Sequence, residues 1–127
     1  MDTKLTTPRP QRAVPRAALL DAWSAHPWRD GLVVDDLSPL DQLTVQTRNS
    51  TYEIIIVSPR AAEVIVRGGR FFPTPTPVRL AGSSLGGSFL KQHGIYVGFR
   101  MELQYDGQTI VTTEVCSIAR TVDQGVQ

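Results

Sequence analysis

The dipeptide Asp106-Gly107 constrains the fold most strongly, because it stands between two long runs of residues typical of strands. Asp-Gly favours the two-residue type I′ turn, in which both central residues need a positive φ. The two runs are therefore predicted to pair as an antiparallel hairpin with Leu103 opposite Ile110. A chain with this signal is expected to fold around β-hairpins.

The same register, carried along the hairpin, gives one face that is almost wholly apolar. It pairs Phe99 with Glu114 and places Cys116 opposite Val97 on this face. Glu114 is the exception, because the register turns its carboxylate toward the core. Two interpretations remain open: a β-bulge shifts the register, or both faces are partly covered, as in a small closed barrel or sandwich.

A second hairpin is predicted upstream, where apolar and polar residues alternate on both sides of an Asn-Ser dipeptide at 49–50. If this dipeptide is the tight turn, Val45 lies opposite Ile54 and Leu43 lies opposite Ile56. The alternation predicts that these four side chains share the buried face of the pair.

Further strands are predicted near 62–67 and 78–81, between segments rich in Gly, Pro and Thr. Turn signals recur about every eight to twelve residues, which is typical of an all-β domain. The predicted fold class is therefore mainly β: a small antiparallel barrel or sandwich of about six to seven strands. This domain is expected to span 42–120, followed by a C-terminal tail at 121–127.

The N-terminal segment 1–41 is expected to be an arm, a short helix and a connector. Residues 1–16 are rich in proline and arginine, which predicts an arm and not a core element. Apolar residues at helical spacing predict a short amphipathic helix at 15–25. Such a helix is marginal alone in water, so it must pack on the barrel or on another chain. Trp23 and Trp28 are the candidate interaction anchors of this N-terminal segment.

Composition is that of a folded, soluble domain, with 41% hydrophobic residues, 20% charged residues and a formal net charge of +1. This net charge gives no general attraction to nucleic acid or to membranes. The sequence shows no apolar run of about eighteen residues and no apolar N-terminal stretch of the kind a signal peptide needs. A cytoplasmic location without a membrane partner is therefore expected.

The sequence offers no convincing set of residues for catalysis. Cys116 and His93 could form a nucleophilic dyad, but Cys116 is expected mid-strand on the apolar face, where a thiol is inert. His26 and His93 are the only histidines and lack the spacing of a metal site. Glu102 and Glu114 are predicted on opposite strand faces. We therefore expect no enzyme, no metal and no cofactor.

A site for an anionic ligand is a further possibility. Between 58 and 80 there are four positive charges against one negative charge, and Phe71-Phe72 lies among them. Guanidinium groups beside aromatic rings and a Gly/Ser loop can hold a phosphate and stack a base. The alternative is that one phenylalanine belongs to the core and the arginines scatter over the surface. The candidate ligand-binding residues are Arg67, Arg70, Arg79, Ser83, Ser84 and Lys91.

The stretch from Val78 to Val115 resembles the second half of a PilZ domain, a β-barrel family that binds cyclic di-GMP. In that family an R-x-x-x-R arm and a [D/N]-x-S-x-x-G segment grip the dinucleotide. Arg12 and Arg16 fit the spacing of the arm, and the segment that begins at Ser84 fits S-x-x-G. Gly82 stands where the Asp or Asn should be. The resemblance implies a barrel that binds a cyclic dinucleotide or, with that residue lost, a protein.

Two functions follow from these features. The favoured one is a non-catalytic interaction or assembly module that acts through the N-terminal arm or helix and the β-domain, with a protein partner or a second copy. It predicts an exposed apolar patch around the tryptophans. The alternative is a PilZ-like barrel that binds an anionic ligand: a cyclic dinucleotide, a nucleotide or RNA. It predicts that the cationic residues converge on one face.

Overall fold

The computed structural model describes residue 23 and residues 30–86 and 89–121. Within these residues the strands are β2 (Gly31–Val33), β3 (Gln42–Thr47), β4 (Thr51–Ser58), β5 (Glu63–Gly68), β6 (Phe72–Ser84), β7 (Leu90–Gln92), β8 (Gly94–Tyr96), β9 (Arg100–Tyr105) and β10 (Gln108–Thr121). Among the described residues, the one helical element whose bounds are given is a short 3-10 turn, η1 (Val34–Asp36). No helix in this part of the chain is long and apolar enough to cross a membrane. The mainly β prediction is confirmed.

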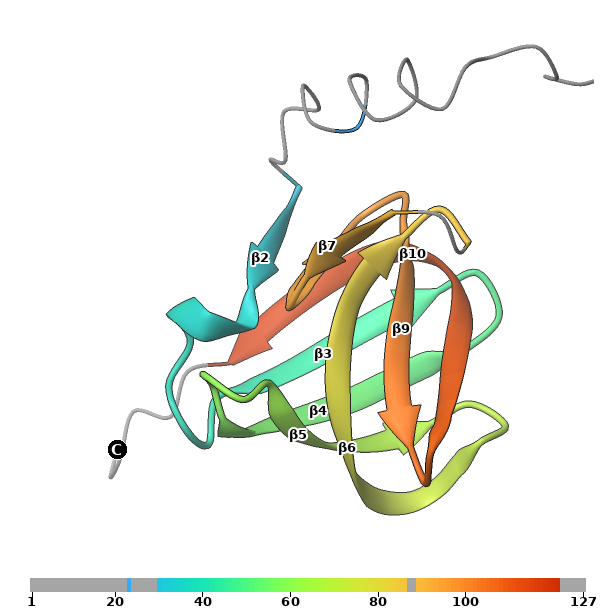
Figure 1. Cartoon of the computed structure of the whole chain (residues 1–127). Helices are drawn as coiled ribbons and strands as arrows, with labels where there is room; N and C mark the ends of the chain where they lie inside the picture. Colours follow the sequence, from blue (N-terminus) through green and yellow to red (C-terminus); the bar gives the residue numbers. More distant parts are fainter. Residues whose placement is uncertain (1–22, 24–29, 87–88, 122–127) are drawn as a thin grey trace, which may run out of the picture.

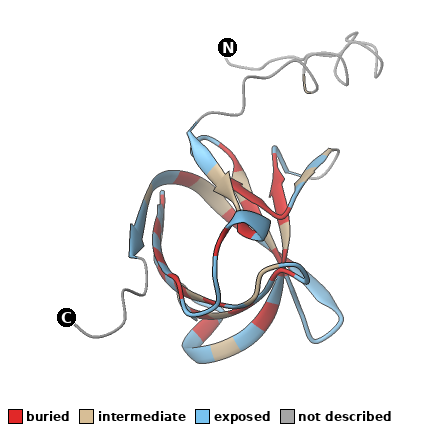
Figure 2. Cartoon of the chain, turned by 90° about the vertical axis from the view of Figure 1, so that its left-hand side faces the viewer, coloured by how far each residue is buried: buried red, intermediate tan, exposed pale blue. Residues whose placement is uncertain are grey.

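Six strands close into a near-barrel (Figure 1). Their order is β5-β4-β3-β10-β9-β6, and β5 also pairs with β6, so the sheet returns to its start. Strand β7 extends the sheet beyond β6, and β2 pairs with β8 in a separate two-stranded sheet. All of these pairings are antiparallel. In Figure 2 the ring is seen with η1 in front of its opening.

The core fills the ring because most strands turn alternate side chains inward. On β3, for example, Leu43 and Val45 are buried while Thr44 between them is exposed. Phe72 of β6 is fully buried as well. The segment predicted as a connector adds to this core, because Val34 of η1 and Leu37 after it are buried with the barrel side chains.

The hairpin predicted around Asp106-Gly107 is confirmed. Leu103 pairs with Ile110, and the two turn residues have φ values of 54° and 76°. Both values are positive, as a type I′ turn requires. The local turn signal therefore sets the register at this end of the hairpin.

Farther along the hairpin the predicted register is wrong, because a β-bulge lies between Val111 and Glu114. Glu114 pairs with Arg100 and not with Phe99. The extra residue turns the Glu114 side chain away from the core, and its carboxylate lies 3.6 Å from the guanidinium of Arg48. The bulge, one of the two interpretations left open, thus removes the buried carboxylate.

The predicted position of Cys116 is also wrong. A second irregularity, between Val115 and Ser117, shifts the pairing of β10 with β3. Cys116 lies at this irregularity, and its side chain is exposed and free of any disulfide. Its thiol is therefore not a small buried side chain of the apolar face opposite Val97.

In the hairpin of β3 and β4 the predicted register is wrong by two residues. Val45, predicted opposite Ile54, faces Tyr52, and Leu43, predicted opposite Ile56, faces Ile54. The reason is that the turn is centred one residue earlier, on Arg48 and Asn49: the residues on either side of them, Thr47 and Ser50, are joined by backbone and side-chain hydrogen bonds. Because the shift is even, the same side chains still face the core.

Candidate functional site

Strand β6 separates the candidate ligand-binding residues that the sequence groups together. Arg70 lies just before β6, whereas Ser83 and Ser84 lie at its far end, and the strand is 13 residues long. At about 3.3 Å per residue this is roughly 40 Å of chain. The six candidates therefore do not converge on one site.

Two of the candidate arginines contact neighbouring strands. Arg67 of β5 forms an exposed ion pair with Glu53, its cross-strand neighbour on β4. Arg79 of β6 donates hydrogen bonds from Nε to the Ala61 carbonyl at 3.3 Å and from Nη1 to the Gln104 side chain at 3.4 Å. These contacts hold both guanidinium groups along the outside of the barrel.

The two candidate serines are buried and bonded within the chain. Ser83 Oγ donates to the Gly94 carbonyl at 2.8 Å. Ser84 Oγ donates to a carboxylate oxygen of Glu102 at 2.5 Å and accepts from the Gly86 N–H at 3.1 Å. A carboxylate beside the hydroxyl disfavours an anion there. Lys91 lies opposite Ser83 on β7 and is half-buried.

The position of Gly82 bears directly on the PilZ resemblance. A Cβ at this residue would come within 2.2 Å of the Lys91 carbonyl oxygen, and φ is +149°. The backbone of β7 therefore leaves no room for an Asp or Asn side chain at this position. Arg12 and Arg16, the candidate arm residues, lie outside the described residues.

Trp23, a candidate interaction anchor, contacts its own chain. Its ring centroid lies 6.0 Å from that of Phe89 and 5.6 Å from that of Phe99, the second in an edge-to-face arrangement. Such ring-to-ring contacts contribute stability beyond that from the burial of the ring surfaces. Trp28, the other candidate anchor, lies outside the described residues.

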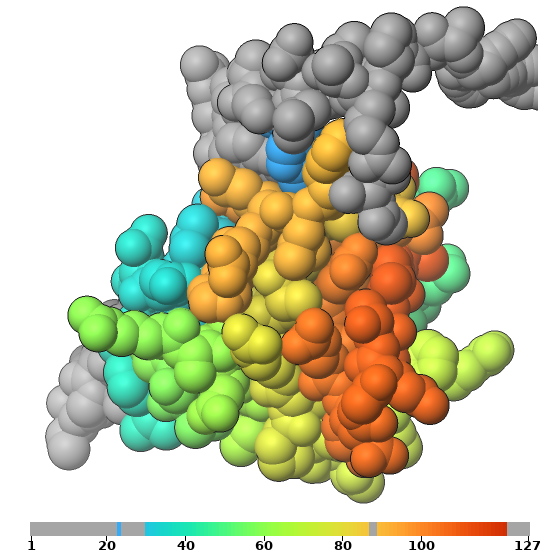
Figure 3. All heavy atoms as spheres, in the orientation of Figure 1, coloured from blue at the N-terminus to red at the C-terminus, as the bar shows by residue number. Residues whose placement is uncertain are grey.

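A pocket of about 420 Å³ lies where the β3–β4 turn and the β5–β6 turn meet the outer face of β10. In the space-filling view both turns project at the right-hand edge of the molecule (Figure 3). The lining residues come from three segments far apart in sequence: Asn49, Ser50, Tyr52, Arg70, Phe71, Val111 and Thr113.

The pocket combines one cation, two exposed apolar side chains and several polar groups. Among the described residues Arg70 has no ion pair. Phe71 is 57% exposed and Val111 is 43% exposed, although large apolar side chains usually lie inside. Burial raises the pKa of Tyr52 above its ordinary 10.0, and a hydrogen bond with the Ser50 side chain opposes this to a smaller extent. The phenol is therefore protonated at neutral pH.

The Phe71-Phe72 pair illustrates what sequence reasoning could and could not find at this pocket. The ring of Phe72 belongs to the core, and the adjacent Phe71 is exposed. The signal that could separate the buried ring from the exposed one is strand alternation, because successive side chains of a strand point to opposite faces. Asn49, Ser50 and Thr113 carried no signal, because only the closure of the barrel brings them to Arg70.

A contact between the nearly buried His93 and the exposed Asp35 was also missed. His93 Nδ1 lies 2.8 Å from a carboxylate oxygen of Asp35, and the His93 carbonyl accepts a bond from the Val34 N–H at 2.9 Å. These contacts join η1 to the turn between β7 and β8. No group of three or more His, Cys, Asp or Glu side chains in the described ranges could hold a metal ion.

Comparisons with known proteins find nothing similar to this chain: no family model, no curated protein and no solved structure matches it. What the chain does must therefore be inferred from its own residues. The pocket beside Arg70 brings one of the candidate residues together with groups suited to a ligand.

Proposed function

We propose that this chain is a non-catalytic binding module whose barrel takes a ligand with an anionic group and a flat ring, such as a nucleotide, in the pocket beside Arg70. The observation that carries the proposal is a guanidinium without an ion pair in the described structure, next to the exposed ring of Phe71. Such a pair can hold a phosphate or carboxylate and stack a planar ring at once.

The surrounding charges favour a ligand with few negative charges. Arg48, beside the pocket residue Asn49, already pairs with Glu114 at 3.6 Å. Arg70 is therefore the cation that remains for the ligand among the described lining residues. The phenol of Tyr52 and the side chains of Asn49 and Thr113 supply donors and acceptors for polar edges of a base or sugar. This arrangement fits one phosphate group attached to one ring.

Chemical-shift titration of the full chain with GMP, guanosine and inorganic phosphate tests the proposal. We expect GMP to bind more tightly than either half-ligand and to shift amide signals in the β3–β4 and β5–β6 turns. Arg70→Gln should weaken GMP binding at least tenfold, because a hydrogen bond to a charged group is worth about 1.5–3 kcal/mol and about 1.4 kcal/mol corresponds to tenfold. A panel with AMP, UMP, cyclic di-GMP and short RNA then ranks the ligands.

Arg60→Gln is the matched control for this titration. Arg60 is an exposed arginine in the turn between β4 and β5, away from the pocket residues. Its replacement should leave GMP binding unchanged. Equal weakening by both substitutions would show only nonspecific attraction of the anion, and the proposed site would have to be abandoned.

A second candidate function is self-assembly, and a different observation favours it. Leu85 is 68% exposed and Leu90 is 42% exposed, and both lie on the hairpin of β6 and β7. Phe89, next to Leu90, contacts the ring of Trp23. Neighbouring exposed apolar groups of this kind are typical of protein interfaces. We propose a second copy of the chain as the partner at this hairpin.

Light-scattering mass after size exclusion tests the assembly proposal. The full chain should elute as a multimer, and the double variant Leu85→Ser/Leu90→Ser should elute as a monomer with unchanged circular dichroism. Deletion of the N-terminal segment 1–40 would not be a clean test of assembly, because it also removes the core residues Val34 and Leu37. A monomeric full chain would end this proposal.

A further inference from the structure

Strand β10 has a backbone edge that is only partly paired. On one side β10 pairs with β3 as far as Thr121. On the other side its pairing with β9 ends at Glu114, and the last backbone bonds there involve Val115. Within the described residues, 116–121 therefore has a ladder partner on one edge only.

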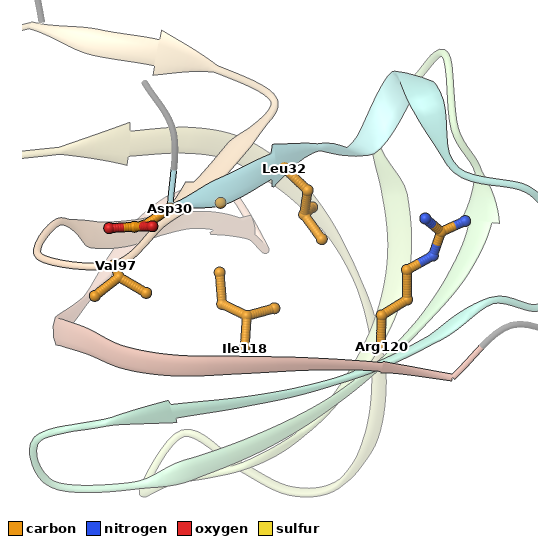
Figure 4. A pocket seen from close by; sticks show the side chains of 6 residues that line it. Asp30, Leu32, Val97, Ile118 and Arg120 are labelled. Carbon is orange, nitrogen blue, oxygen red and sulfur yellow. The ribbon is translucent and has the colours of Figure 1, made fainter. Parts of the chain in front are cut away.

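Strand β2 lies across from this edge, and a cavity of about 340 Å³ separates the two strands. In the close-up view Leu32 points from β2 toward Ile118 of β10, and Arg120 stands at one end of the cavity (Figure 4). Asp30 and Val97 stand at the other end. Strand β2 itself pairs with β8 alone in the described structure. The cavity is thus a slot between β2 and β10, with an apolar centre and opposite charges at its ends.

We propose that this slot binds an extended peptide segment of a protein partner as an added strand along residues 116–121 of β10. Unpaired backbone N–H and C=O groups at a strand edge are recognised by another strand. The free edge spans about 20 Å, which is the length of an ordinary strand. An antiparallel orientation follows the pattern of the other pairings in this fold.

The lining side chains define the chemistry of the peptide. In an antiparallel peptide, the residue nearest the N-terminus lies opposite Arg120, and the residue two positions later lies opposite Ile118. The residue two positions after that lies at the end of the slot where Asp30 stands. It should therefore carry an acidic residue, then an apolar residue, then a basic residue, at alternate positions. Arg120 already donates one hydrogen bond to the buried Asp41 at 3.1 Å. A guanidinium has five N–H donors, so others remain for the acidic residue of the peptide.

The slot and the pocket beside Arg70 are independent, because they have no lining residue in common. Asp30 is the residue best suited to a test. It is exposed, and among the described residues its side chain has no ion pair. Its backbone carbonyl accepts a bond from the Val97 N–H at 2.7 Å, which a side-chain substitution leaves in place.

The experiment is an anisotropy titration of the full chain with a fluorescein-labelled peptide of the form Thr-Glu-Thr-Val-Thr-Lys-Thr. We expect saturable binding. Methylation of the backbone nitrogens that face β10 should weaken it by more than tenfold, because the added strand loses donors and gains a clash. A peptide with Glu and Lys exchanged should bind about fivefold more weakly, since exposed ion pairs are worth up to about 1 kcal/mol.

A charge exchange at Asp30 locates the binding. Asp30→Lys should weaken the Glu-Val-Lys peptide by about fivefold and strengthen a Glu-Val-Glu peptide by a similar factor. Circular dichroism checks that the variant keeps its fold. The proposal is overturned by an absence of saturation up to about 1 mM peptide, which marks very weak affinity. It is equally overturned if the methylated peptide binds as well as the parent, or if Asp30→Lys leaves the charge preference unchanged.

Discussion

The far end of β6 and the pocket beside Arg70 both contain candidate ligand-binding residues, but their polar groups differ in whether they have partners within the chain. At the far end, the Ser83 and Ser84 hydroxyls are buried and bonded to groups of their own chain. At the pocket, Arg70 has no ion pair in the described structure, and Phe71 is exposed beside it. Polar groups with internal partners stabilise a fold, whereas groups without them remain available to a ligand. The Gly/Ser stretch is thus a structural feature in its described part.

Gly82 gives the most severe test of the close packing at the far end of β6. In Gly82→Ala the new methyl group would lie 2.2 Å from the Lys91 carbonyl oxygen at a φ of +149°. We expect the free energy of unfolding to fall by about 3 kcal/mol, because the backbone of β7 must move or the β6–β7 pairing must break. Urea unfolding followed by circular dichroism measures the change.

Gly107→Ala is the matched control, because Gly107 also has a positive φ, +76°, but a Cβ there would meet nothing within 4 Å. It should cost only about 1 kcal/mol, from backbone strain in the type I′ turn. If the two substitutions cost the same, the close approach of β7 to Gly82 is not what excludes a side chain there.

The internal bonding at the far end of β6 can be tested at Ser83. Ser83→Ala removes the bond to the Gly94 carbonyl and leaves that buried oxygen without this donor. We expect a loss of about 1–2 kcal/mol in the free energy of unfolding and unchanged affinity for GMP. A lower GMP affinity at full stability would reverse the assignment and make this end a ligand site.

The sequence predicted the architecture well because hairpin turns and strand alternation are local signals. The pairing of Leu103 with Ile110 needed only the Asp-Gly dipeptide and a period of two. The prediction of register failed where a β-bulge adds one residue to β10. The bulge before Glu114 has no local sequence signature, yet it reverses which side chains of the strand face the core.

The candidate site was less predictable, since it depends on how the barrel closes. Neighbours in sequence such as Arg67 and Arg70 have different surroundings, one in an ion pair and the other beside a pocket. Thr113, which lines the same pocket as Arg70, is more than forty residues away in the chain. Nothing in the composition of the β5–β6 turn points to such a residue.

At the pocket, Tyr52 gives a pH-dependent test. Burial raises the pKa of its phenol above the ordinary 10.0. A raised folded-state pKa means that the stabilisation is fully present below pH 10 and is lost as pH rises through the folded value. At pH 7, Tyr52→Phe should lower the free energy of unfolding by about 1 kcal/mol, because it loses the hydrogen bond with Ser50. It should also show a smaller decline in stability than the parent above pH 10.

Urea midpoints between pH 7 and 11 measure this difference, and absorbance at 295 nm follows phenol ionisation directly. Tyr96 also has a pKa raised by burial and by the charge of Asp36, so it contributes a second late transition. The Tyr52→Phe variant must lose one of the late components. If the whole late absorbance change persists in Tyr52→Phe, the phenol of Tyr52 does not ionise late. The side of the pocket that Tyr52 lines would then be more open to water than its burial implies.

The smallest expected effect on stability is at Arg70 itself. Arg70→Gln should change the free energy of unfolding by less than about 0.5 kcal/mol, because the side chain is exposed and has no ion pair among the described residues. Arg67→Gln is the companion variant: it removes the exposed pair with Glu53 and should cost no more than about 1 kcal/mol, with the cost falling as salt is added. Urea midpoints at low and high salt distinguish the two. A salt-dependent loss for Arg70→Gln as large as that for Arg67→Gln would mean that Arg70 stabilises the fold, and its guanidinium could no longer be assigned to a ligand.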